Sequence, residues 1–297
     1  ATKTINQAGI KREDKAHLLY HRGRAYVALR KMDEAAADFK SAVQSVSGQI
    51  GFHLDLADAL AQAGRTDEAA DAYKAAIARF PNDPIIYNNR GMFLQRQGKS
   101  SEEIADFTQA FQLNPKAYYA LTNRGFALLK SGDEPAAEND FTASLKLDPE
   151  QPRAYGLRAS AKIAQGRLDE GIADHKESTS RDPKNSVAWA NLGYACFFAG
   201  DYSGAVKSFD KAVELDSGRR YLHPWQHLSM MQAGQADAAK TKFAKIMQAD
   251  TAKRDWIDHL LSYLGGQIDG ETLIQSINDK PGVKVPQLCE AHFFIAE

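Results

Sequence analysis

The 297-residue sequence is poor in cysteine and balanced in charge. Its two cysteines, Cys196 and Cys289, form no C-x-x-C pair, so neither a disulfide framework nor a thiolate zinc or thioredoxin motif is expected. No uncharged apolar run approaches the roughly 20 residues that span a bilayer, and no signal-peptide pattern opens the chain. With 37 basic and 38 acidic residues, the net charge of −1 lacks the basic excess of a nucleic-acid binder.

What the sequence does have is an internal period of 34 residues. Glycines recur at this spacing, and so do prolines, a small residue and an aromatic ring. The glycines are Gly64, Gly98, Gly132, Gly166, Gly200 and Gly234; the rings are Phe39, Tyr73, Phe107, Phe141, Phe209 and Phe243. Periods of 20 to 50 residues are typical of solenoid and array proteins, so the period predicts a repeat architecture rather than one closed core.

Each repeat predicts two antiparallel helices. In residues 84–117, Tyr87, Gly91 and Leu94 share one helical face, and a second stripe follows the turn at Gly98 and ends before Pro115. A proline cannot continue a helix, and it pushes the preceding residue out of the α region. Because neither helix covers its apolar stripe alone, the repeats are expected to stack.

The pattern resembles the tetratricopeptide repeat (TPR), with a ring or leucine, a small residue four positions later, and then alanine, ring and proline. The residues that match the pattern closely are Trp189, Leu192, Gly193, Ala205 and Phe209. The resemblance implies an all-α, right-handed superhelical solenoid. We expect a lead-in over 1–15, seven helix pairs over 16–253, and a helical segment over 254–297. The expected pairs are 16–49, 50–83, 84–117, 118–151, 152–185, 186–219 and 220–253.

Several repeats depart from this pattern. Residues 152–185 carry His175 in place of the ring and Gly171 in place of alanine, and residues 84–117 carry Glu103 in place of alanine. We interpret His175 as a residue at the edge of the core rather than a ligand. The last repeat has His227 in place of the small residue and Pro224 in its first turn, so we expect it to bend away from the stack.

Arginines and aspartates recur together in four repeats. An arginine precedes the small residue wherever an aspartate precedes the ring, and both are missing where leucine stands in the first position. The pairs are Arg22 and Asp38, Arg90 and Asp106, Arg124 and Asp140, and Arg158 and Asp174. This covariation within the chain predicts charge-assisted hydrogen bonds, either within a helix pair or to the next repeat. Their expected role is structural.

The expected binding surface is the concave face that first helices line in TPR proteins. Residues at three- and four-residue steps share that face. It carries three amides that could bond an extended backbone, Asn89, Asn123 and Asn191, and four rings that could anchor a partner, Tyr119, Phe126, Tyr194 and Phe197. The alternative is that these rings only fill the space between neighbouring helices, and Phe198 is expected in the core. The carboxylate clamp of co-chaperone TPR domains is incomplete, because Met92 and Leu157 stand where asparagine and arginine are needed.

No motif of an enzyme, metal site or cofactor site is present. Gly98-Lys99-Ser100 resembles the end of a phosphate-binding loop, but Phe93 replaces the opening glycine and the segment lies between two helices. G-x-S-x-G and H-E-x-x-H motifs do not occur. We therefore expect a non-catalytic chain without metal or cofactor.

The C-terminal residues also resemble bacterial envelope TPR adaptor lipoproteins. The resemblance spans Pro224-Trp225, Trp256, Leu264-Gly265 and residues 289–294. It implies a bacterial source and favours the periplasm or envelope over the cytoplasm. Residues 293–296 predict a further first helix, which either folds back onto 254–264 or continues into another repeat; we favour continuation. Since the chain begins at Ala1, we expect a processed or trimmed N-terminus.

The leading functional prediction is a non-catalytic scaffold or adaptor that binds a segment of a protein or peptide partner in its concave groove. One alternative is a self-association module, a homo-oligomer whose groove is filled by its own chain or by a second copy. Another is an accessory part of an enzyme whose catalytic segment lies outside this chain.

Overall fold

The computed structural model describes residues 9–249, 256–277, 287 and 290–294, and within these ranges the regular secondary structure is entirely helical. In the first half the helices are α2 (Arg12–Ala28), α3 (Met32–Ser45), α4 (Ile50–Gln62), α5 (Thr66–Arg79), α6 (Pro84–Arg96), α7 (Ser100–Leu113), α8 (Tyr118–Lys130) and α9 (Glu134–Leu147). In the second half they are α10 (Pro152–Ala164), α11 (Leu168–Arg181), α12 (Ser186–Phe198), α13 (Tyr202–Leu215), the 3-10 helix η1 (Arg220–Leu222), α14 (His223–Gln232), α15 (Ala236–Ala249), α16 (Trp256–Leu264) and α17 (Gly270–Gln275).

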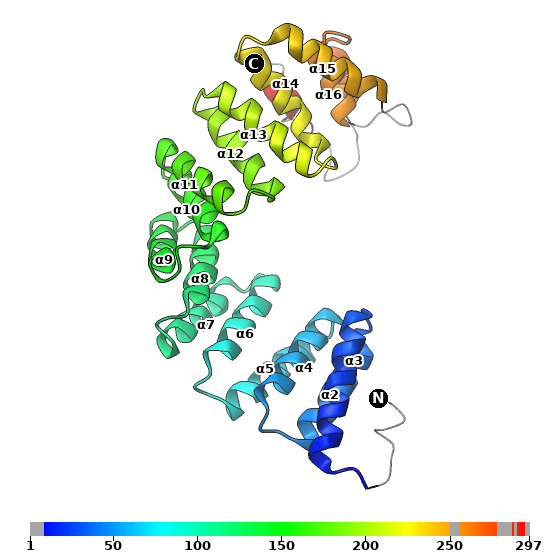
Figure 1. The fold of residues 1–297 in the computed structure, drawn as a ribbon, viewed down its shortest axis with the longest axis vertical. Coiled ribbons are helices and arrows are strands. Elements are labelled where there is room, and N and C mark those ends of the chain that lie inside the picture. Colours follow the sequence, from blue (N-terminus) through cyan, green and yellow to red (C-terminus); the bar gives the residue numbers. More distant parts are fainter. Residues whose placement is uncertain (1–8, 250–255, 278–286, 288–289, 295–297) are drawn as a thin grey trace. The chain divides into compact units, whose positions relative to one another are not determined.

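Consecutive helices form pairs joined by tight turns (Figure 1). The turn glycines, from Gly64 to Gly234 at the 34-residue spacing, all have positive φ values between 72° and 82°. This left-handed conformation ends each first helix and is easily reached by glycine. Arg30 occupies the equivalent position of the first pair with a φ of 57°, so the conformation is required even where glycine is missing.

The ring of each second helix packs against the small residue of its first helix. A Cβ added to Gly23 would lie 2.6 Å from Cε1 of Phe39, and one added to Gly193 would lie 2.6 Å from Cε1 of Phe209. Real Cβ atoms do not approach a ring this closely, so glycine is needed in the four regular pairs where phenylalanine fills the gap; in the last pair His227 lies against Phe243 instead. This contact sets the close approach of the two helices and explains why both positions repeat.

The contacts divide the chain into two units, Ala1–Pro149 and Glu150–Glu297. The first contains α2 to α9, and part of its core is built from Phe39, Tyr73, Ile86 and Phe93 with the alanines around them. The second contains α10 to α17, and its core joins α12 and α13 to the C-terminal residues Leu260, Leu273, Ala291 and Phe294.

The last helix pair and the segment after it differ from the regular repeats. The 3-10 helix η1 precedes α14, and α14 has only 10 residues against 13 in α12. Residues 290–294 pack back onto this unit, where Ala291 and Phe294 are buried and the indole Nε1 of Trp256 donates to Glu290 at 2.7 Å. Residues 290–294 therefore have the fold-back arrangement, one of the two that we considered. Cys289, Ile295 and Ala296 lie outside the described residues.

Candidate functional site

The candidate binding site is a groove between the first helices α10 and α12, which we call the α10–α12 groove. It encloses about 590 Å³. Its lining residues are Ser160, Ile163, Ala164, Gly166, Leu168, His175, Asn191, Tyr194, Ala195 and Phe198. No aspartate, glutamate, lysine or arginine is among these lining residues, so the groove offers apolar walls and a few neutral polar groups.

Phe198 forms the exposed edge of this groove. It keeps 61% of its surface accessible, although its ring lies 5.5 Å from that of Phe197 and 5.9 Å from that of Trp225. The sequence-based expectation that Phe198 belongs to the core is wrong. Phe197, expected to face a partner, is instead 6% exposed and packs between Tyr202 and Trp225. Phe197 is thus the buried ring and Phe198 the exposed one, the reverse of what we expected. The two differ because consecutive residues of a helix point about 100° apart.

The imidazole of His175 contributes to the floor of the α10–α12 groove. His175 is 3% exposed, and its Nδ1 atom has no hydrogen-bond partner among the described residues. Burial lowers the pKa of His175 to about 4, against the smaller opposite effect of Asp174. The ring is therefore neutral near pH 7, with one nitrogen as a donor and the other as an acceptor.

The first unit contains a groove at the same repeat positions, between α2 and α4. It encloses about 350 Å³ and is lined by Arg24, Val27, Ala28, Phe39, Asp55, Asp58, Ala59 and Gln62. One of its carboxylates is already engaged, since the hydroxyl of Tyr73 donates to Asp58. Burial raises the pKa of Asp58, partly offset by that hydrogen bond. This α2–α4 groove is thus smaller and charged.

The three amides expected to face a partner have different surroundings. Asn123 is buried, and its Nδ2 donates to Oδ1 of Asn88 at 2.9 Å. Asn89 is half-buried and accepts a hydrogen bond from Nδ2 of Asn88. Asn191 is exposed and lines the α10–α12 groove. Of the three, Asn191 alone lies in this groove. Asn89 and Asn123 belong to the first unit, where both bond Asn88, a residue that the sequence pattern did not single out.

The remaining expected rings are also divided. Tyr119 is half-buried against alanines of α7 and α8, and Phe126 is half-buried with the Lys130 ammonium 6.0 Å from its ring centre. Tyr194 is half-buried and lines the α10–α12 groove, and burial raises its pKa. The structure therefore brings Asn191, Tyr194 and Phe198 together, whereas Tyr119 and Phe126 lie in the other unit.

The repeated arginines and aspartates pair within each helix pair, the first of the two arrangements that we considered. Each guanidinium donates from Nε and Nη2 to the two carboxylate oxygens, at 2.6 to 2.8 Å. Asp174 also forms an ion pair with Lys162, whose Nζ lies 2.9 Å from Oδ2. Burial alone raises the pKa of Asp174, but the bonds from Arg158 and Lys162 outweigh burial and lower it.

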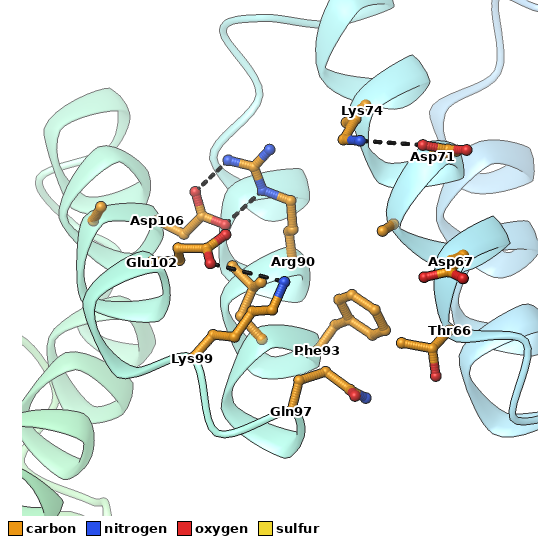
Figure 2. Close-up of a pocket in the computed structure, with 13 residues that line it drawn as sticks. Thr66, Asp67, Asp71, Lys74, Arg90, Phe93, Gln97, Lys99, Glu102 and Asp106 are labelled. Carbon is orange, nitrogen blue, oxygen red and sulfur yellow. Dashed lines mark hydrogen bonds and ion pairs between the residues drawn. The ribbon is translucent and has the colours of Figure 1, made fainter.

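A further cleft, shown in Figure 2, lies among α5, α6 and α7. It encloses about 550 Å³, and three ion pairs line it: Arg90 with Asp106, Lys99 with Glu102, and Lys74 with Asp71. The charges of these three pairs neutralise one another, and Asp67 adds one further carboxylate to the lining. Lys99, part of the loop-like Gly98-Lys99-Ser100 sequence, is engaged with Glu102 at 3.8 Å.

Metal-binding clusters and membrane-spanning helices are absent from the described ranges. These ranges contain no cluster of three histidine, cysteine or carboxylate side chains that could hold a metal ion. None of the helices there is long and apolar enough to cross a membrane. Glu103, the unusual residue of α7, is buried at 1% exposure, and burial raises its pKa against the attraction of Lys130.

The stacked helix pairs, with their repeated ring contacts and turn glycines, define an α-helical repeat protein. Tetratricopeptide repeat profiles match residues 16–45, 54–118, 122–185 and 186–219, so the chain belongs to the tetratricopeptide repeat family.

Two curated relatives match short stretches of the chain. One is the "Lipoprotein NlpI homolog" of Haemophilus influenzae, 32% identical over 94 residues, which are 32% of this chain and 29% of the relative. The other is "Small glutamine-rich tetratricopeptide repeat-containing protein 2" of Mycosarcoma maydis, 39% identical over 54 residues, or 18% and 15% of the two chains. The chain thus spans less than a third of the length of either relative.

Solved structures share the fold at low sequence identity. PilF of Pseudomonas aeruginosa superposes with a TM-score of 0.61 at 18% identity, covering 72% of this chain and 98% of PilF. PilW, described as a type IV pilus biogenesis factor, superposes with a TM-score of 0.60 at 22% identity, covering 69% of this chain and 94% of PilW. These likenesses support the all-α TPR solenoid.

Proposed function

We propose that this TPR protein is a non-catalytic scaffold that binds a segment of a partner protein in the α10–α12 groove. The observation that carries the proposal is the 61% exposed ring of Phe198 at the edge of an apolar groove of about 590 Å³. Large apolar side chains beside a concave, mostly apolar surface are typical of binding sites. Asn191 supplies an exposed amide that can donate to and accept from a backbone.

The site differs in part from the sequence-based set. Asn191 and Tyr194 are kept, Phe198 is added, and Ile163 and Leu168 complete the walls. Asn89, Asn123, Tyr119, Phe126 and Phe197 are not part of the proposed site.

We place this activity in the bacterial envelope. The support is that the Haemophilus relative is described as a lipoprotein and PilW as a type IV pilus biogenesis factor. The proposal would be tested by fractionating cells of the source bacterium and probing each fraction with an antibody against the chain. Detection in the cytoplasmic fraction alone would contradict it.

A random peptide library displayed on phage tests the groove directly. The full chain and a Phe198→Asp variant are used as separate targets, with Leu29→Asp as the control, since Leu29 is 68% exposed in the other unit. We expect enriched peptides to bind the original chain and the Leu29→Asp chain but not the Phe198→Asp chain. Peptides that bind all three equally, or no enrichment at all, would overturn the proposal.

Self-association is the second candidate function, favoured by the exposed apolar surface of Phe198. Sedimentation velocity over a hundredfold range of protein concentration separates the two. A mass that stays that of one chain supports partner binding. A dimer that Phe198→Asp dissociates would show that the groove binds a second copy instead.

A further inference from the structure

His175 gives the α10–α12 groove a floor that differs from that of the equivalent groove in the first unit. The repeat places a phenylalanine at this position in five other helix pairs, including Phe39 under the α2–α4 groove. Imidazole is smaller than a benzene ring and polar at two atoms. Consistent with this, the groove above His175 encloses about 590 Å³, against about 350 Å³ above Phe39.

The neighbours of His175 are adjusted to this smaller floor. Gly171, in the usual alanine position, leaves space for Ile163, because a Cβ there would lie 2.4 Å from Cγ1 of Ile163. Ile163 in turn forms a wall of the groove. His175 and Gly171, the two departures from the repeat pattern in this helix pair, therefore both affect the shape of the α10–α12 groove.

One polar atom of the His175 ring makes no hydrogen bond within the described part of the chain. Nδ1 is buried and has no hydrogen-bond partner among the described residues, and the His175 side chain lines the groove. Buried polar groups in folded proteins are almost always hydrogen-bonded, so an unpaired imidazole beneath an open groove points to a polar atom supplied by a ligand. This ligand atom must be uncharged, because no charged residue lines the groove.

The neighbouring helix shows how a ring-bearing segment covers this face of the molecule. Trp225 of α14, at the repeat position equivalent to Asn191, is covered by residues 290–294, with Phe293 and Phe294 ring centres 5.1 and 5.5 Å from it. Trp225 also contacts Phe198 at 5.9 Å. The α10–α12 groove thus continues from a surface on which the chain itself seats a short segment with aromatic side chains.

From these observations we infer that the α10–α12 groove accepts a tyrosine side chain, carried by a short uncharged segment of the partner, whose hydroxyl hydrogen-bonds the ring of His175. This rests on the proposed function and specifies its ligand. The phenol ring packs against Ile163, Leu168 and Phe198, and aromatic groups gain most from such apolar walls. A hydroxyl both donates and accepts, so it pairs with either tautomer of a neutral imidazole.

Fluorescence anisotropy with defined peptides tests the inference on the full chain. The probes are labelled peptides of leucine, alanine and serine with capped ends, identical except for a central Tyr, Phe or Ala. The Tyr peptide should bind about tenfold more tightly than the Phe peptide, the factor that one well-made hydrogen bond supplies. The Ala peptide should bind weakest.

The variants His175→Phe and His175→Ala identify the group responsible. His175→Phe restores the ring that five other pairs carry, so it should fold, and it should abolish the preference for Tyr over Phe. His175→Ala should also abolish this preference while the groove stays open, so the test survives if one variant fails to fold. Equal binding of the Tyr and Phe peptides by the original chain, or a Tyr preference that persists in both variants, would overturn the inference.

The Phe198→Asp variant separates this inference from the proposed function. If peptide binding is lost with Phe198→Asp but shows no Tyr preference, the groove binds partners and the role of His175 is wrong. If no peptide binds, or if binding is unaffected by Phe198→Asp, both the groove function and the role of His175 are wrong.

Discussion

The α2–α4 groove and the α10–α12 groove occupy the same repeat positions in two different units, yet their chemistry differs. In the first, Asp55 and Asp58 line the wall above the ring of Phe39. In the second, Asn191 and Tyr194 occupy the positions of those aspartates, above the imidazole of His175. The first groove is charged and small, and the second is neutral and large.

The difference is possible because separate positions of the repeat determine packing and groove chemistry. Both grooves stand on a helix pair that an arginine–aspartate bond joins, Arg22 with Asp38 and Arg158 with Asp174. Side chains on the exposed face of a first helix take no part in this bond. They can change from acidic to aromatic without moving a helix, which is how one repeat supports many partners.

The largest expected effect comes from removing the ring below the charged groove. Phe39 is fully buried against Gly23, so Phe39→Ala should lower the free energy of unfolding by about 3–5 kcal/mol, from lost apolar burial and the cavity left behind. Urea denaturation followed by circular dichroism measures this. Leu29→Ala, at a 68% exposed position, should change stability by less than about 0.5 kcal/mol. Similar costs for the two variants would show that the ring does not support the frame.

The arginine–aspartate bonds should differ between the units. Arg124→Leu leaves Asp140 buried without the guanidinium and should cost about 3 kcal/mol. Arg158→Leu leaves Asp174 with Lys162 at 2.9 Å, so about 1 kcal/mol is expected.

The double variant Arg124→Leu with Asp140→Ala is the control for this comparison. It removes both charges and should recover most of the loss, as measured by the same denaturation. If the double variant is as unstable as Arg124→Leu alone, the bond does not account for the cost.

The stability of the original chain and that of a His175→Phe variant should respond differently to acid. The pKa of His175 is about 4 in the folded chain and near 6.5 when unfolded, so the unfolded chain takes up a proton first as the pH falls. The resulting stability is fully present above pH 6.5 and is lost as the pH falls toward 4. Between pH 7 and 5 the original chain should lose about 2 kcal/mol more than His175→Phe. Other buried histidines cancel in this difference, and equal losses would show that His175 is not buried in its neutral form.

The smallest effects on stability are expected for Asn123 and Asn191, which occupy the same repeat position in different units. Asn123→Ala removes a buried hydrogen bond to Asn88 and should cost about 1 kcal/mol. Asn191 is exposed, so Asn191→Ala should change stability by less than about 0.5 kcal/mol and act on peptide binding instead. Thermal denaturation compares the two. A larger cost at Asn191 would indicate a structural role.

Much of the frame could be predicted from the sequence because repetition makes local rules visible. Gly23 and Phe39 recur as a pair since a ring needs space where two helices cross, and this constraint acts inside one repeat. The pairing of Arg124 with Asp140 was also visible, because both are missing together where Leu56 and Leu192 stand. Arg30 was less visible, since it takes the backbone conformation of a turn glycine without being one.

The binding surface could be predicted only in part, since exposure depends on the next repeat. Phe197 and Phe198 are adjacent and chemically identical, and nothing local distinguishes the buried ring from the exposed one. The difference arises because Trp225 and Tyr202 cover Phe197. Likewise, the repeat pattern predicted an accessible Asn123, whereas in the structure its amide donates to Asn88 of the preceding repeat.

By itself, then, the sequence determined the helix pairs, their turns and the bonds within each pair, because these depend on residues at most one period apart. Tertiary structure alone decided which rings and amides stay accessible, how large each groove is, and where residues 290–294 pack. Those properties depend on how neighbouring repeats and the C-terminal segment cover one another. The burial of a side chain in this way depends on many weak contacts between distant residues, and no local sequence pattern encodes it.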